Sequence, residues 1–302
     1  MKKTAPPPLV LNTISDLHRE LDLPKPLHPL VSVINLKEVP CTINRGIDSL
    51  LYNFYSVCTK RDFTGRMKYG QHYYDFDNGI MTFFSPGQVI STEGSDISVN
   101  GMWLVFHPDF LRGYGLDRNI KDYGFFSYAI HEALHLSEVE ETQVNNVMHA
   151  IQKEYEQPID RFSQDVIISQ IELLLNYSNR FYNRQFITRK QANTDLIIKM
   201  EQLLTEYFNS EEHCLPRVKD LADHLNVSPG YLSDMLRAHT GQNAQQHIHN
   251  KLIEKAKETL ATTNLSVSEI AFKLGFEHSQ SFSKLFKAKA NMSPLEYRRQ
   301  FN

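Results

Sequence analysis

Scarce cysteines and the lack of any long apolar run set the first limits on this chain of 302 residues. Its three cysteines, Cys41, Cys58 and Cys214, are an odd number without metal-site spacing, which favours reduced thiols in a cytoplasmic protein. No run of 18 apolar residues occurs, so we expect no membrane span. The chain starts Met-Lys-Lys, as a signal peptide can, but no apolar segment follows, so no secretion signal is expected.

Signatures of several enzyme classes are also missing. The sequence contains no G-x-S-x-G, no nucleotide-binding P-loop and no dinucleotide-binding G-x-G-x-x-G. The net charge of −3 does not by itself suggest a nucleic-acid partner. The charge is uneven, however, because residues 250–302 hold nine Lys and Arg against five Asp and Glu, and residues 180–190 add four cations without an acid. A local basic face of this kind, rather than the total charge, is what contacts phosphates.

Residues 266–298 predict two helices joined by a tight turn. Apolar residues recur at helical spacing in both halves, and Gly275 between them can adopt the positive φ that ends a helix sharply. The apolar positions are Val267, Ile270, Ala271 and Leu274, then Phe276 at the corner, then Phe282, Leu285 and Phe286. The other face of the second helix is polar and comprises Ser279, Gln280, Ser281, Ser283, Lys284 and Lys287. Such groups suit base edges and phosphates, so the pattern predicts a DNA-contacting helix-turn-helix at about 266–290.

The motif occurs a second time, about 49 residues earlier, at about 216–238. The residues of this copy that could contact DNA are Ser228, Gly230, Tyr231, Ser233, Asp234 and Arg237. Between the copies, residues 244–262 predict a helix of roughly 27 Å, close to the ~34 Å between successive major grooves. For a single helix, the alternative is that the polar residues are only the solvated face of an amphipathic helix; the duplication and spacing favour DNA contact.

These motifs make residues 195–302 resemble the DNA-binding domain of the AraC/XylS family of bacterial transcription regulators. The resemblance rests on Ile270-Ala271, Gly275-Phe276, Ser279 to Lys284, Phe286-Lys287, Ser293-Pro294 and Tyr297-Arg298, with Ala256-Lys257 fitting the family's linker helix. Asn291 replaces the usual glycine, but Asn also tolerates a left-handed helix cap. Asp234 stands where the family often has a basic residue. An anion facing phosphates weakens binding, so we expect the first copy to bind DNA less tightly than the second.

The first 110 residues predict a β-rich domain. Runs at 30–36, 50–57, 71–76, 80–85 and 101–106 are rich in Val, Ile, Tyr and Phe, with turn residues at 77–79 and 86–87. They predict a small sandwich or barrel, and the resemblance implies a cupin-like barrel that holds an effector. Aromatic residues that could line its pocket are Tyr52, Phe54, Tyr73, Phe83 and Trp103, although for any one of them ordinary core packing is the favoured alternative. The region lacks the H-x-H of metal-binding cupins, and we expect no cofactor.

Two helices are predicted next, within about 137–183. Ser137 and Glu140 form a capping box, Pro158 breaks the first helix, and the second runs from about 160 to 183. The apolar stripe of the second helix is wider than the ~100° needed to pack on one domain, and the resemblance implies a dimerisation role. The predicted subunit contacts are Ile167, Ile171, Leu174 and Leu175, with packing inside the domain as the alternative. Residues 186–194 are polar without apolar periodicity, which predicts an interdomain linker.

One motif suggests a different function. His131-Glu132-Ala133-Leu134-His135 matches the H-E-x-x-H of zinc metalloproteases, in which two histidines one helical turn apart bind zinc. The capping box at Ser137 starts a new helix two residues later, so we expect the motif to end a preceding segment rather than lie on one long helix. Glu156 and Asp160, possible third ligands, flank the break at Pro158. The two histidines are therefore predicted to be surface or interface residues.

The sequence thus predicts an α+β chain of two domains. Residues 1–185 form a cupin-like β-barrel or sandwich with a helical pair, and residues 195–302 form an all-α tandem helix-turn-helix domain. The predicted function is a cytoplasmic, homodimeric, sequence-specific transcription regulator, and the resemblance favours an activator. Its expected partners are double-stranded promoter DNA, a small-molecule effector and, for an activator, RNA polymerase. The alternatives are a zinc metalloprotease, or a regulator that responds to a protein or to no ligand.

Overall fold

The computed structural model describes residues 8–39, 49–61, 63–69, 72–76, 79–91, 100–209 and 215–301. The chain divides into two compact units, Met1–Gln185 and Phe186–Asn302. The first unit contains the sheets and the second is helical, so the mixed α and β character predicted from the sequence is confirmed. In the described part of the chain, no helix combines the length and apolar character needed to cross a bilayer.

The first unit is built on an antiparallel five-stranded sheet with the order β10-β7-β4-β9-β2. Its strands are β2 (Val31–Asn35), β4 (Tyr55–Arg61), β7 (Ile80–Phe84), β9 (Asn100–Phe106) and β10 (Leu134–His135). A three-stranded sheet has the order β1-β3-β8, with β1 (Leu9–Leu11), β3 (Ser49–Tyr52) and β8 (Gln88–Ser91). The remaining pair is β5 (Phe63–Tyr69) and β6 (His72–Phe76).

Most strand predictions are confirmed, but the run 50–57 is two strands in different sheets. The chain changes sheet at Asn53, whose backbone N–H donates to Leu11 O at 3.0 Å and whose side chain donates to Asn12 at 2.6 Å. Phe54 then turns fully inward. The predicted turn at Pro86-Gly87 is present, with Gly87 at φ +80°. The turn residues Asp77 and Asn78 lie outside the described residues.

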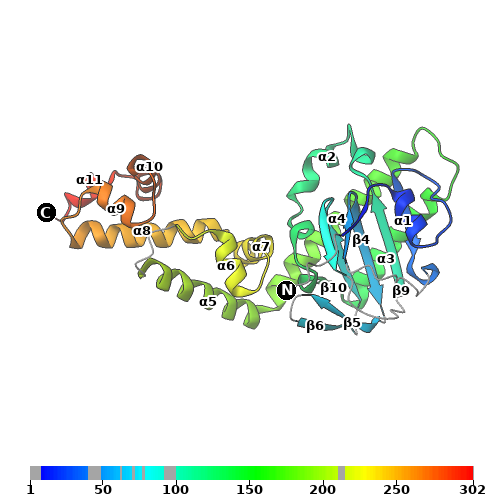
Figure 1. Ribbon diagram of the computed structural model, residues 1–302, viewed down its shortest axis with the longest axis horizontal. Helices are drawn as coiled ribbons and strands as arrows, with labels where there is room; N and C mark the ends of the chain where they lie inside the picture. The colour runs from blue at the N-terminus through cyan, green and yellow to red at the C-terminus, as the bar shows by residue number, and fades with distance from the viewer. Residues whose placement is uncertain are drawn as a thin grey trace, which may run out of the picture. The chain divides into compact units, whose positions relative to one another are not determined.

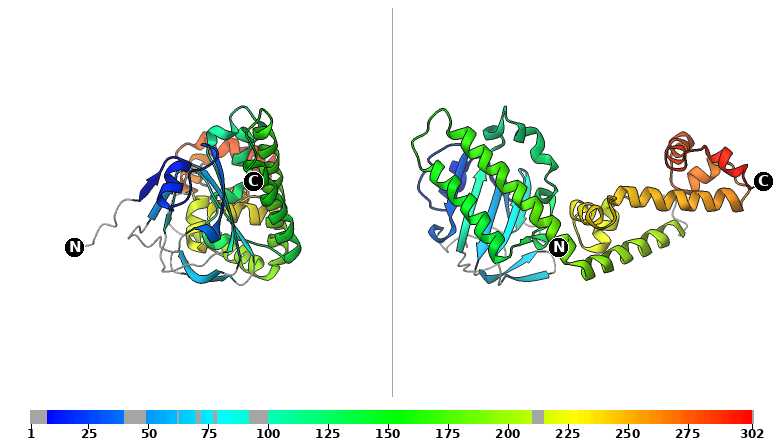
Figure 2. Two further views of the ribbon diagram at one scale, coloured as in Figure 1. Left: turned by 90° about the vertical axis from the view of Figure 1, so that its right-hand side faces the viewer. Right: turned by 180° about the vertical axis from the view of Figure 1, so that it is seen from behind.

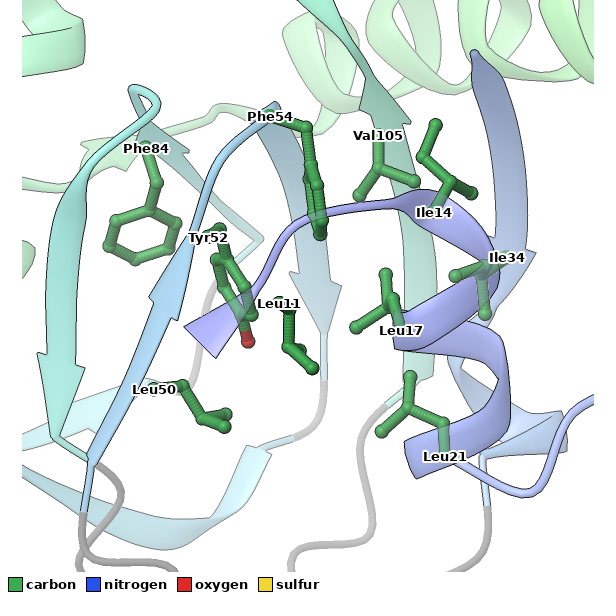
Figure 3. Packing of buried hydrophobic residues seen from close by; sticks show 10 residues of the cluster. All are labelled: Leu11, Ile14, Leu17, Leu21, Ile34, Leu50, Tyr52, Phe54, Phe84 and Val105. Atoms are coloured by element: carbon green, nitrogen blue, oxygen red, sulfur yellow. The ribbon is translucent and has the colours of Figure 1, made fainter. Parts of the chain in front are cut away.

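An apolar cluster fills the space between the two sheets and the N-terminal helix α1 (Ile14–Glu20). Figure 3 shows Tyr52 and Phe54 beside Leu11 and the apolar face of α1. The Tyr52 and Phe54 rings stack with centroids 5.2 Å apart. Trp103 packs at the margin of the cluster and donates from Nε1 to Ser56 Oγ at 2.6 Å. Burying an aromatic side chain from water stabilises the fold by about 1.5–3 kcal/mol, so this cluster holds the sheets together.

Helices α3 (Glu138–Tyr155) and α4 (Ser163–Thr188) cover the other face of the five-stranded sheet (Figure 2). The predicted capping box is confirmed, because Ser137 Oγ accepts from Glu140 N and Glu140 Oε2 accepts from Ser137 N. The shorter helices of this unit are α2 (Gly115–Asn119) and the 3₁₀ helices η1 (Leu36–Glu38), η2 (Pro108–Leu111), η3 (Ile120–Asp122), η4 (Gly124–Ser127) and η5 (Ile130–Glu132).

The four residues predicted as subunit contacts are instead buried within their own chain. Ile167, Ile171, Leu174 and Leu175 have exposed fractions of 5% or less. The stripe of α4 is wide because the helix packs on two neighbours: Ser178 Oγ lies 3.9 Å from Met81 Sδ of the sheet, and Arg184 pairs with Glu140 of α3. Side chains covered in this way have no surface left for a partner.

The stretch 186–194, predicted as an irregular linker, is largely helical. Helix α4 continues to Thr188 and α5 (Lys190–Asn209) begins two residues later. Asn193 is buried, and its side-chain amide donates to Phe186 O at 2.7 Å. A helix held by buried polar contacts shows no apolar periodicity, which is why the sequence pattern did not reveal it.

The second unit contains two helix pairs joined by a long helix (Figure 1). Helices α6 (Val218–Leu225) and α7 (Pro229–Thr240) lie toward one end of α8 (Ala244–Thr262), and α9 (Val267–Lys273), α10 (Ser279–Ala290) and α11 (Pro294–Arg298) lie at the other. The helix predicted at 244–262 coincides with α8. Asn243 caps it, accepting from Gln246 N at 2.9 Å.

Candidate nucleic-acid interface

The turn between α9 and α10 has the geometry that the sequence predicts. Gly275 adopts φ +86°, and its N–H donates to Phe272 O at 3.0 Å. The N–H of the next residue, Phe276, donates to Ala271 O at 2.9 Å. These two bonds satisfy carbonyls at the end of α9 and fix the direction in which α10 starts.

The turn between α6 and α7 repeats this geometry 49 residues earlier. Asn226 adopts φ +55°, and its N–H donates to Asp223 O at 3.3 Å. The N–H of Val227 donates to Ala222 O at 3.0 Å. Asn is among the few residues other than glycine that tolerate a left-handed cap, so the two turns match despite different residues. The duplication seen in the sequence is thus a duplication of backbone structure.

Helix α10 separates its apolar and polar faces. Phe282 and Phe286 are fully buried, and the Phe282 ring lies 5.5 Å from that of Phe276. Gln280, Ser281, Lys284 and Lys287 are exposed, whereas Ser279 and Ser283 are half-buried. The exposed set therefore offers one amide, one hydroxyl and two ammonium groups on a single helical face.

Helix α7 has fewer exposed side chains that could contact DNA than the sequence predicts. Ser228 accepts from Tyr231 N at 3.2 Å as the N-cap. Tyr231, predicted to contact DNA, is buried, and its ring packs edge-on against Phe186 with centroids 5.2 Å apart. This contact removes the ring from the surface and corrects the prediction. Gly230 and Ser233 are half-buried.

The acid and the cation of α7 pair with each other. Arg237 Nη1 donates to Asp234 Oδ1 at 2.7 Å, one helical turn apart. Arg237 was predicted as a phosphate contact and Asp234 as a repelling anion. The ion pair couples the two roles, because a phosphate must compete with Asp234 for the guanidinium.

Comparison with known proteins agrees with this geometry. A family model described as a helix-turn-helix domain matches residues 221–300. The transcriptional activator AarP of Providencia stuartii is 38% identical over 79 residues, which are 26% of this chain and 58% of that protein. The uncharacterized HTH-type transcriptional regulator YfiF of Bacillus subtilis is 29% identical over 151 residues, 47% of this chain and 45% of that protein. Residues 221–300 form an AraC-type helix-turn-helix domain.

A solved structure, the C-terminal domain of the response regulator yesN from Fusobacterium nucleatum, is also similar. It shares 31% identity, with a TM-score of 0.31, over 34% of this chain and 98% of that chain. The chain spans about half the length of the curated relatives it matches.

The AraC-type domain contains a structural contact that the sequence pattern did not explain. Arg298 donates from Nη2 to Leu265 O at 2.6 Å and from Nε to Leu260 O at 3.3 Å. It therefore satisfies carbonyls at the end of α8 and in the loop before α9. These two bonds give Arg298 a structural role, because they join the end of α8 to the loop before α9.

Capping boxes start the outer helices of the same domain. Ser266 N donates to Glu269 Oε2 at 2.6 Å at the start of α9, and Ser293 N donates to Glu296 Oε2 at 2.7 Å at the start of α11. These hydrogen bonds from Ser266 and Ser293 hold the pKa of both carboxyls below the ordinary value. Asn291, predicted as a left-handed cap, adopts φ +57°.

The predicted effector-pocket residues do not share one space. Tyr52, Phe54 and Trp103 meet in the cluster between the sheets. Side chains alternate along a strand, so Phe83 lies on the opposite face of β7 from Phe84, which belongs to that cluster. The Phe83 ring packs instead against Phe125, with ring centroids 4.4 Å apart. The side chain of Tyr73 lies outside the described residues.

The HEALH segment is not one helix. Ile130–Glu132 form η5 and Leu134–His135 form β10, which pairs with β7. His131 and His135 therefore do not lie one turn apart on a helix, as a zincin requires. Glu132 is buried and accepts from Ala129 N at 2.6 Å, so it closes the turn. Among the described residues no group of three or more His, Cys, Asp or Glu could hold a metal ion.

Proposed function

We propose that the protein is a sequence-specific transcription regulator that inserts α7 and α10 into successive major grooves of duplex DNA. The observation that carries this proposal is the repeated turn, with equivalent hydrogen bonds at Asn226-Val227 and Gly275-Phe276. Helix α8 joins the two pairs over 19 residues, about 28 Å. That length is compatible with the ~34 Å between grooves on one side of B-DNA.

Activation of transcription is favoured over repression within this proposal. Among the similar proteins, AarP and RhaS are named transcriptional activators. RNA polymerase would then be a partner, and the protein would act in the cytoplasm. The proposed division of labour assigns DNA binding to residues 195–302 and sensing to residues 1–185, with residues 186–194 connecting them.

A cupin-like, effector-binding and dimeric N-terminal domain completes the proposal. Two sheets that enclose an aromatic cluster support the cupin-like architecture. The dimer surface is reassigned to the solvent side of α4, where Val166, Leu173 and Ile187 are 37%, 45% and 62% exposed. Exposed apolar side chains along one helix suit contact with a second copy of the chain.

Selection of bound duplexes from a random-sequence pool tests the function with the full chain. We expect one or two sequence elements to be enriched, and the affinity for them to fall steeply with salt as phosphate contacts release counterions. Failure to enrich any sequence, or binding that ignores salt, would refute the proposal. Binding by Gln280→Ala should lose its preference for the selected sequence, whereas Glu277→Gln, outside the face of α10, should keep it.

A further inference from the structure

A single residue outside the repeated motif contacts helix α7 at two points. Phe186 is the first residue of the second unit and is 2% exposed. Its ring packs edge-on against Tyr231, in the first turn of α7, with centroids 5.2 Å apart. Its carbonyl oxygen lies 2.9 Å from Nε2 of His239, in the last turn of α7. Phe186 therefore contacts both ends of the first recognition helix.

The carbonyl of Phe186 is placed to accept from side chains because it lies in the last turn of α4. The last four carbonyls of an α-helix have no donor within that helix, and Phe186 lies two residues before the final residue of α4. Asn193 of α5 is 3% exposed, and its Nδ2 donates to the Phe186 oxygen at 2.7 Å. One peptide oxygen thus receives side chains from both α5 and α7.

The two donors do not compete for this oxygen. A carbonyl oxygen can only accept, so Nε2 of His239 carries a hydrogen and donates to it. Asn193 Nδ2 lies 3.2 Å from the same Nε2, and two N–H donors do not bond to each other. Both side chains therefore donate to Phe186, whose carbonyl has two lone pairs to accept them.

These contacts lie on the side of α7 away from Arg237. An α-helix turns by about 100° per residue, so Tyr231 and His239, at i and i+8, lie within about 80° of each other. Arg237, two residues before His239, lies about 200° around the axis from it, nearly the opposite side. Tyr231 is accordingly buried, whereas Arg237 is 58% exposed. Any rotation of α7 that breaks the inner contacts also changes the direction of Arg237.

The apolar contacts of α7 do not fix this rotation by themselves. Leu232, Met235 and Leu236 are fully buried and hold the helix against its neighbours. Apolar attraction has no direction, so it tolerates a small rotation of the helix. A hydrogen bond weakens steeply when its length or angle departs from the preferred range. The bonds of Asn193 and His239 to one oxygen therefore select one orientation among those that the apolar side chains allow.

We propose that Asn193 and His239 are positioning residues that set the orientation of α7 on DNA through the carbonyl of Phe186. Phe186 and Asn193 precede residues 221–300, so part of the device lies before the AraC-type domain. The inference deepens the proposed function and rests on it, because it takes α7 to enter a major groove. The order of α7 itself can be measured without DNA.

Affinity of full-chain variants for the sequence selected from the random pool tests where His239 acts. His239→Ala should weaken binding by roughly three- to tenfold, the equivalent of one lost hydrogen bond. Two double variants locate the loss. With Arg237→Gln, which removes the cation of α7, the two losses should overlap, and the double variant should bind little worse than either single variant. With Gln280→Ala on α10, the two losses should multiply.

Two further variants separate positioning from a general loss of structure. His239→Gln keeps an N–H donor near the position of Nε2 and should restore most of the affinity lost in His239→Ala. His224→Ala is the matched control, because His224 is exposed on α6 and contacts Asp220 O of its own helix. We expect this variant to bind as the wild type does.

Hydrogen–deuterium exchange of the full chain without DNA measures the order of α7 directly. His239→Ala and Asn193→Leu should raise exchange of the α7 amides about tenfold and leave α10 unchanged. The proposal is overturned if α7 exchange stays at the wild-type level in either variant, if α10 exchange rises equally, or if the losses of His239→Ala and Arg237→Gln multiply. It is also overturned if the wild type binds selectively and His239→Ala binds equally well. A wild type without sequence-selective binding would refute the proposed function, and raised exchange confined to α7 would still establish its anchoring by Phe186.

Discussion

Replacing Asp234 by Asn should strengthen non-specific DNA binding and make it more sensitive to salt. In the structure Asp234 accepts from Arg237 at 2.7 Å, and Arg237 is 58% exposed. Asn has nearly the same size and shape as Asp, but it carries no charge to hold the guanidinium. The substitution therefore frees one cation on α7 and removes one anion from the surface that we propose faces phosphates.

The expected magnitude follows from counterion release. One additional phosphate contact changes the slope of log K against log salt by about −0.9. Relative to 1 M salt, where the extra contact contributes nothing to the affinity, this slope corresponds to roughly a fivefold gain in affinity at 0.15 M and roughly a fifteenfold gain at 0.05 M. Protein stability should change little, because exposed helical ion pairs contribute only about 0.3–0.5 kcal/mol.

Fluorescence anisotropy with a random-sequence duplex, measured between 0.05 and 0.3 M salt, gives both the affinity and the slope. Asp223→Asn is the matched control, because Asp223 is exposed on α6 and has no ion pair within the described residues. It makes the same change in net charge without freeing an arginine. We expect its slope to stay close to that of the wild type.

The double variant Asp234→Asn/Arg237→Gln separates the two contributions. If the freed guanidinium causes the gain, the double variant loses it. A gain that persists without Arg237 would show that Asp234 acts only by repelling phosphates, and the coupling argued from the ion pair would be wrong. Equal behaviour of Asp234→Asn and Asp223→Asn would refute the reasoning altogether.

Three further predictions concern other parts of the chain. Gln280→Ala should weaken binding to the selected sequence by about 1–3 kcal/mol and binding to random duplexes by less, which competition titrations measure; equal losses would exclude base contact by Gln280. Arg298→Met should lower the free energy of unfolding by about 1–3 kcal/mol in urea denaturation, because the carbonyls of Leu260 and Leu265 lose their donor; an unchanged midpoint would contradict that role. Metal analysis of the purified protein should find well under one zinc per chain, and a tightly held zinc lost on His131→Ala would contradict the reading of η5 and β10.

The helices of the second unit were predictable because local signals mark their ends. Asn243 caps α8, Gly275 ends α9 with a positive φ, and Asn291 ends α10 in the same way. The apolar positions between these signals recur at helical spacing. Local chemistry and tertiary structure agree there, so the segment 266–290 and the polar face of α10 could be located from the sequence.

The remaining features depend on contacts between residues far apart in the chain. Tyr231 is buried against Phe186, a residue outside the repeated motif. Because the repeat carries no sign of this contact, the sequence predicted the Tyr231 ring on the DNA-facing side. Helix α5 begins within a polar stretch, where Asn193 is held by Phe186 O. The stripe of α4 was assigned to a dimer because its second neighbour, α3, could not be positioned from the sequence.

The two helix pairs share a backbone but not a recognition surface, and this difference bears on how the domain would read DNA. In α7 the tyrosine is buried and the arginine is held by its own acid. In α10 the amide of Gln280 and the ammonium groups of Lys284 and Lys287 are exposed without an ion pair in the described structure. Amides and free cations form base and phosphate contacts directly, whereas Arg237 must first leave Asp234. Binding should therefore begin with α10, and α7 should add affinity only where the local phosphate geometry draws Arg237 away from Asp234. Such a requirement favours DNA of one shape over another without any contact to its bases.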